Sequence, residues 1–110
     1  MKIVDRKTFL QLDKETLYSK YEPCCFGDLK IKCISNMSDD FVNQGITNAI
    51  EYGSSGEYLD ILELAEKNGE SFTMDFDCPG RDGCFDEDQL FAIWEKEDVE
   101  QLIERLKTLL

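Results

Sequence analysis

Alternating apolar and polar residues mark two early stretches of the chain as β-strands. Residues 16–22 alternate in this way and are followed directly by proline. Residues 29–33 alternate as well, with Lys30 and Lys32 on the polar side, so we expect a half-buried strand whose exposed face carries two ammonium groups. The intervening residues 23–28 are short enough to join the two strands as a hairpin.

Two later stretches have the spacing of amphipathic helices. Between residues 57 and 68 the apolar positions recur at intervals of three and four, Ser54 offers an N-cap, and Gly69 offers a C-terminal stop. Residues 97–110 repeat this spacing, with acidic residues in the first turn where the helix dipole favours them. A shorter helix is expected after Asp5, which is also a suitable N-cap.

A second hairpin is expected near the end of the chain. Residues 72–77 alternate between apolar and acidic side chains, and residues 89–95 form a strongly apolar run, with residues 78–88 as their loop. Residues 35–52 have no clean period and are read as either a short strand or an irregular loop. We therefore predict one α+β domain over residues 1–110, with an antiparallel sheet of about four strands and two main helices packed on one face.

Composition fits a globular domain, with 42% hydrophobic and 11% aromatic residues. The longest apolar run, residues 90–94, is far shorter than the ~20 residues that span a bilayer. The first seven residues carry charges where a secretory signal is apolar, so we expect a cytoplasmic protein. There the five cysteines would remain thiols.

The formal charge of −12 is unevenly distributed. Residues 1–34 hold seven basic and five acidic residues, a net of +2, whereas residues 35–110 hold five basic and nineteen acidic residues, a net of −14. The negative electrostatic potential of residues 35–110 repels nucleic acid and anionic membranes and attracts basic surfaces. We expect a protein partner with a basic surface, and neither direct nucleic-acid binding nor membrane binding.

The chain contains no histidine, which removes the commonest routes to nucleophile activation and metal-assisted hydrolysis at neutral pH. No other catalytic combination of residues stands out. We therefore predict a protein that is not an enzyme and that uses no cofactor.

Metal binding is the second hypothesis. Cys78 and Cys84 could combine with Cys24 or Cys25 around zinc, although their spacing differs from that of structural zinc sites. The acidic residues between 75 and 88 could hold Ca²⁺ or Mg²⁺, but the register of a calcium loop is missing. Both groups have a simpler interpretation, as reduced thiols and as a solvated turn.

The first hypothesis treats the carboxylates as a partner-binding surface. Closely spaced carboxylates imitate a phosphate backbone and can occupy a basic groove that otherwise holds nucleic acid, although an acidic surface often serves solubility alone. A third hypothesis is a structural subunit that packs against itself or another chain through the Trp94 hairpin. The candidate partner-binding residues are Asp75, Asp77, Asp82, Asp86, Glu87 and Asp88 on the second hairpin, and Glu57, Asp60 and Glu63 on the middle helix.

Two blocks of sequence resemble small acidic proteins of phage and prophage origin: residues 2–10 with residues 17–24, and residues 74–78 through residues 80–83 to residues 89–92. Accessory proteins of that group include inhibitors of host defence nucleases, such as anti-CRISPR and anti-restriction proteins. The resemblance therefore implies an inhibitory function and assigns no catalytic residue.

Overall fold

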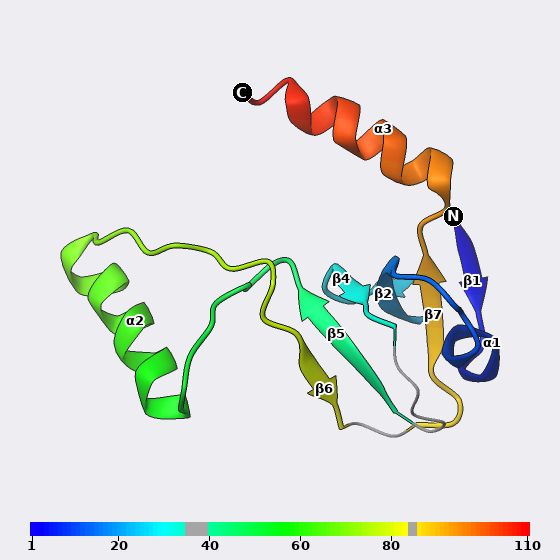
Figure 1. Cartoon of the computed structure of the whole chain (residues 1–110), viewed down its shortest axis with the longest axis horizontal. Coiled ribbons are helices and arrows are strands. Elements are labelled where there is room, and N and C mark those ends of the chain that lie inside the picture. Colours follow the sequence, from blue (N-terminus) through cyan, green and yellow to red (C-terminus); the bar gives the residue numbers. More distant parts are fainter. Residues whose placement is uncertain (35–39, 84–85) are drawn as a thin grey trace.

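The computed structural model describes residues 1–34, 40–83 and 86–110, which form an antiparallel sheet and three helices (Figure 1). The helices are α1 (Arg6–Leu10), α2 (Ser55–Asn68) and α3 (Lys96–Lys107). The strands are β1 (Lys2–Val4), β2 (Thr16–Glu22), β3 (Cys25–Phe26), β4 (Lys30–Lys32), β5 (Phe41–Gly45), β6 (Gly80–Asp82) and β7 (Leu90–Ile93).

The strands follow the spatial order β1-β7-β2-β4-β5-β6, and β3 extends β2 as a small hairpin. All recorded pairs are antiparallel, with Ser19 of β2 opposite Ala92 of β7 and Leu17 opposite Ile31 of β4. The α+β class and the antiparallel sheet are confirmed. Within the described residues the sheet has seven strands instead of about four, because short strands such as β1 and β6 pair at its edges.

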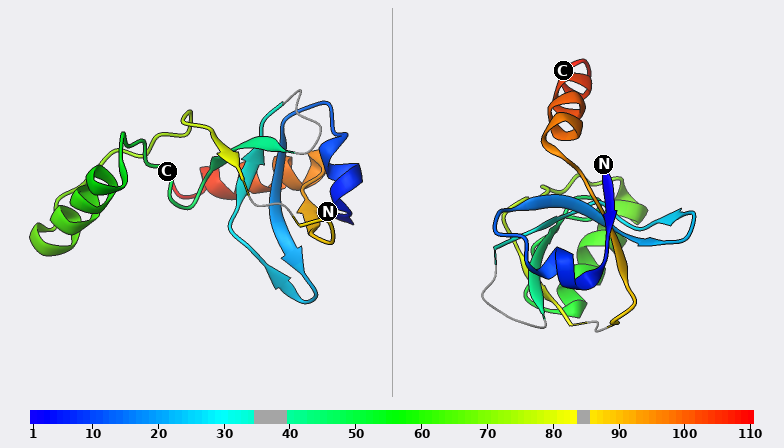
Figure 2. Two further views of the ribbon diagram at one scale, coloured as in Figure 1. Left: turned by 90° about the horizontal axis from the view of Figure 1, so that it is seen from below. Right: turned by 90° about the vertical axis from the view of Figure 1, so that its right-hand side faces the viewer.

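The core is a cluster of four aromatic rings. Figure 2 shows that the sheet is curled. Phe9 of α1 stacks on Phe91 of β7 with ring centroids 3.9 Å apart and also contacts Tyr18 of β2 and Phe41 of β5. One side chain thus reaches three strands, which requires the sheet to wrap around α1. The cap that starts α1 is local, since the Asp5 side chain accepts a hydrogen bond from the Thr8 N–H at 2.8 Å.

Polar groups also enter this concave interior. Lys32 is buried against the Phe9 ring and donates to the Leu12 carbonyl at 3.2 Å. Burial lowers the pKa of Lys32. The expectation that Lys32 lies on an exposed face is therefore wrong: the alternation in β4 is real, but its lysine side faces the core.

The two longer helices stand away from the sheet. The chain passes from β5 into an extended segment, α2, and a returning segment, so that α2 lies at the far end of an arm, and α3 leaves the opposite side of the body (Figures 1 and 2). Neither helix has a buried residue. The prediction that both pack on one face of the sheet is wrong, because neither helix buries a residue against the sheet.

The second expected hairpin is also wrong. Residues 71–79 form no strand, and β7 pairs with β1 and β2 instead. Residues 35–52, left open by the sequence, hold β5 from Phe41 onward, and residues 35–39 lie outside the described part of the chain. No helix in the described ranges is both long enough and apolar enough to cross a bilayer.

Candidate partner-binding site

The acidic arm, defined here as residues 46–79, is held to the sheet at a narrow neck. Gln44 is buried in β5, and its amide donates to the carbonyls of Gly45 at 2.8 Å and Asp75 at 3.2 Å. Its Oε1 accepts from the Cys78 N–H at 2.6 Å. A further bond joins the Asp75 N–H to the Ala49 carbonyl at 2.7 Å. These hydrogen bonds thus join the outgoing segment, residues 44–49, to the returning segment, residues 75–78, where the arm leaves the sheet.

The helix at the end of the arm begins and ends where its local sequence predicts. The Ser54 hydroxyl accepts from the Glu57 N–H at 3.2 Å, and the Glu57 carboxylate accepts from the Gly53 N–H at 2.8 Å. At the other end Gly69 adopts a φ of +66° and donates to the Ala65 carbonyl. Both predicted caps are confirmed, and they fix the direction in which α2 presents its side chains.

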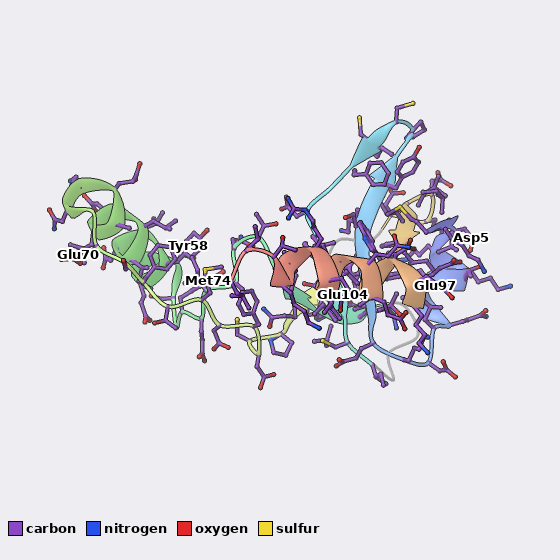
Figure 3. The ribbon with its side chains drawn as sticks, turned by 90° about the horizontal axis from the view of Figure 1, so that it is seen from above. Asp5, Tyr58, Glu70, Met74, Glu97 and Glu104 are labelled. Atoms are coloured by element: carbon purple, nitrogen blue, oxygen red, sulfur yellow. The ribbon has the colours of Figure 1, made fainter. Side chains whose placement is uncertain are left out.

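The exposed face of α2 combines carboxylates with leucines. Its less exposed side carries Tyr58 and Ala65, and Tyr58 packs on Tyr52 with ring centroids 4.7 Å apart. Leu59 and Leu64 lie exposed among the acidic residues. Figure 3 shows the side chains of α2 extending into solvent around most of the helix. The exposed acidic residues of this face are Glu57, Asp60, Glu63 and Glu66.

The arm as a whole is strongly acidic. Residues 46–79 contain eight carboxylates and one lysine, a net of −7. All of these residues are described, and the single ion pair recorded among them joins Lys67 to Glu63 at 2.5 Å. Asp75 and Asp77 lie on the returning segment, where the Asp75 carboxylate accepts from the Asp77 N–H at 2.9 Å. Most of this charge is therefore available to a partner.

Asp82 does not belong to this surface. It is 8% exposed in β6, and its carboxylate lies 2.9 Å from the Lys20 ammonium group inside the curled sheet. The prediction that Asp82 contacts a partner is corrected: it holds β6 against β2. Its neighbour Arg81 pairs with Asp40 and lowers the pKa of that carboxyl group, so Arg81 is engaged at the start of β5.

The remaining predicted carboxylates, Asp86, Glu87 and Asp88, form a separate exposed turn. The Asp86 side chain accepts from the Asp88 N–H at 2.9 Å, which shapes the turn. The arm enters β6 at one end, and this turn follows its other end (Figure 1). The structure therefore divides the predicted surface into two acidic groups and does not place them on one hairpin.

The metal hypothesis gains no coordinating cluster from the structure. Within residues 1–34, 40–83 and 86–110, no three Cys, Asp or Glu side chains converge as metal ligands would. Cys24 and Cys25 are exposed at the β2–β3 turn, and Cys78 is half-buried at the neck. Cys84 lies outside the described residues.

Comparison of the chain with protein-family models, with curated proteins and with solved structures finds no match. The site therefore has to be judged from its own residues. The sequence analysis does not predict two features of the candidate site. One is the buried Gln44, whose role depends on contacts with distant backbone. The other is the pair of exposed leucines at positions 59 and 64. These leucines have a signal in the sequence, since both fall on the acidic side of the predicted helix.

Proposed function

We propose that this chain is a non-enzymatic binding protein whose acidic arm occupies a basic surface on a protein that handles nucleic acid. The observation that carries the proposal is the arm itself, with eight carboxylates and one lysine on a segment that projects from the sheet. Opposite charge across an interface accelerates encounter and selects the partner.

The spacing of the carboxylates supports competition with nucleic acid. Glu57, Asp60, Glu63 and Glu66 follow one another at three-residue intervals. Each step is about 4.5 Å along the helix axis. Phosphates of one DNA strand are about 3.4 Å apart along the duplex axis, so neighbouring carboxylates of α2 have a similar axial spacing. Because each step also turns by about 300°, the four spread over about half of the helix circumference, and neighbouring carboxylates are the ones that would enter one basic groove together.

Leu59 and Leu64 give such an interface an apolar component. Charge chiefly steers association, while a few well-packed residues near the centre of an interface supply most of the binding energy. An inhibitor of anti-CRISPR or anti-restriction type, which the resemblance to phage proteins implies, is the form of this function that we favour.

The test is affinity capture from host cells with the full chain, at low and at high salt. We expect a basic protein that is released by raised salt and by added duplex DNA. The triple variant D60N/E63Q/E66Q should lose most of this capture. The control E97Q/E100Q/E104Q on α3 removes the same charge and should retain capture, although it breaks two ion pairs on its helix where the arm variant breaks one.

Equal capture by both variants would contradict a role for the arm. Capture that is insensitive to salt would contradict an electrostatic mechanism altogether. The triple variant D86N/E87Q/D88N asks separately whether the second acidic group contributes.

A further inference from the structure

The chain exposes more surface than a folded monomer of its size. Its accessible surface is 7956 Å² at 12.7 kDa, whereas monomers of that mass average about 6,200 Å². Its radius of gyration is 15.8 Å, against about 13 Å for a typical 110-residue domain. The surplus, roughly 1,700 Å², is about twice what one partner contributes to a standard interface. The arm and α3 are the two elements that project.

The uncovered side of α3 is a wide apolar stripe. At 100° per residue, the apolar side chains within α3 fall within about 100° of the helix circumference. Leu106 is 50% exposed and Leu109 is 70% exposed, and no stripe residue is buried. By the same geometry Glu97 and Glu104 lie on the opposite side of the helix. The stripe consists of Val99, Leu102, Ile103 and Leu106 in α3, and Leu109 and Leu110 continue it just beyond the last helical residue, Lys107.

A cleft with an apolar part adjoins the base of this helix. It has a volume of about 360 Å³, and its apolar part is formed by Leu12, Leu17, Ile93, Trp94 and Val99. Charged residues also line it, namely Lys2, Lys14, Glu15, Glu95 and Lys96. Stripe and cleft are continuous, because Val99 belongs to both. Together they form an apolar surface that runs from the sheet along α3.

We propose that this surface is covered by the same surface of a second copy of the chain, with the two α3 helices antiparallel. The charges of α3 complement one another in that orientation. Residues 96–101 carry three carboxylates and one ammonium group, a net of −2, and the Met1 ammonium group, 2.5 Å from Asp98, reduces the charge of this half to −1. Residues 102–107 carry two cations and one carboxylate, a net of +1. Antiparallel pairing places each acidic half beside a basic half, and the helix dipoles also oppose one another.

This arrangement brings the stripe residues into layers. Leu109 of one copy lies beside Val99 of the other, at the mouth of the cleft that contains Trp94, and Leu102 lies beside Leu106. Such a contact is isologous, so it closes with two copies and does not propagate. It leaves both acidic arms free, and it neither requires nor excludes the proposed function of the arm.

The test is light scattering on the full chain, after size-exclusion chromatography, from about 1 to about 100 µM, a range suited to a micromolar dimer. We expect twice the monomer mass at the upper end. Fluorescence of Trp94, the single tryptophan, should move to longer wavelength on dilution as the cleft becomes solvated. This second measurement uses the unmodified protein and does not depend on any variant folding.

Two variants locate the contact. Leu106→Glu should yield a monomer at all these concentrations, whereas Leu64→Glu makes the same change at a matched exposure of 48% on α2 and should leave the dimer intact. A native chain that is monomeric throughout, a dimer that survives Leu106→Glu, or a dimer lost in Leu64→Glu would each overturn the inference. The arm variant D60N/E63Q/E66Q should remain dimeric, so loss of capture and loss of dimer are separate results.

Discussion

Lys20 and Asp82 meet at 2.9 Å across the concave side of the sheet, although β4 and β5 separate their strands in the hydrogen-bonded order. The ion pair can form only if the sheet curls until β6 approaches β2. The ion pair therefore stabilises the curled form of the sheet, which encloses the aromatic cluster around Phe9.

Removing the Lys20 ammonium group from this ion pair should destabilise the fold. Lys20→Met leaves the Asp82 carboxylate buried beside an apolar side chain, and we expect a loss of about 2 kcal/mol in the free energy of unfolding, measured with urea. Lys67→Met breaks an exposed pair of similar geometry and should cost less than about 0.5 kcal/mol. Equal costs would mean that burial of Asp82 adds nothing.

Stability should decline in alkaline solution because of Tyr18. Burial raises the pKa of its hydroxyl group, and the nearby Asp82 carboxylate adds to the effect. The folded state then keeps a proton that the unfolded state releases above about pH 10, so the stabilisation is complete below that pH and is lost as the pH rises further. Urea midpoints at about pH 8 and about pH 11 should show the decline.

The variant Tyr18→Phe separates this effect from general alkaline damage. The hydroxyl group is buried and has no hydrogen-bond partner among the described residues, so its removal should change stability at neutral pH by less than about 1 kcal/mol. It should also flatten the alkaline decline. Tyr52→Phe, at an exposed tyrosine, should leave the decline unchanged.

The β2–β3 turn should be improved by glycine at one position only. Cys24 has a φ of +67°, a conformation that costs a residue with a Cβ atom about 1–2 kcal/mol. Cys24→Gly should therefore raise the free energy of unfolding by about 0.5–1 kcal/mol after the entropy of the more flexible unfolded chain is subtracted. Cys25→Gly, in the adjacent strand, should lower the free energy of unfolding. A change of the same sign in both variants would refute the turn geometry.

Two glycines of the arm should respond in opposite directions to alanine. Gly56 lies in the first turn of α2 with room for a Cβ atom, and Gly56→Ala should stabilise the helix by about 0.5–1 kcal/mol. Gly69 has a φ of +66°, and Gly69→Ala should weaken the helix by about 1 kcal/mol. Hydrogen exchange should change in residues 55–68 and stay constant in β2 and β7; coupled changes would show that the arm and sheet unfold together.

Local signals predict much of the secondary structure. Residues 16–22 form β2 as expected, and the limits of α2 follow from Ser54 and Gly69, because each device acts within four residues of itself. Periodicity also finds the apolar stripe of α3. Periodicity identifies the apolar face of a helix and does not identify the surface that covers it. For this reason the sequence alone predicts that both helices pack on the sheet.

The remaining features depend on contacts between distant parts of the chain. Residues 72–77 alternate like a strand, but Gln44 binds the backbone of Asp75 and Cys78, which holds this segment in the neck. In the sequence, Asp82 cannot be distinguished from the neighbouring surface carboxylates. In the structure, the curl of the sheet brings Lys20 to it. Periodicity assigns a residue to a side of a strand and leaves open which side faces the core, as Lys32 shows.

The neck has a consequence for engineering. Since the Ala49 carbonyl and the Asp75 N–H are bonded at 2.7 Å, the chain leaves and re-enters the sheet at nearly the same point. A segment closed so tightly at its base can be exchanged as a cassette. Transplanting residues 50–74 into a surface loop of an unrelated carrier should transfer recognition of its target, while a short linker in their place should leave the β5–β6 ladder of this protein standing.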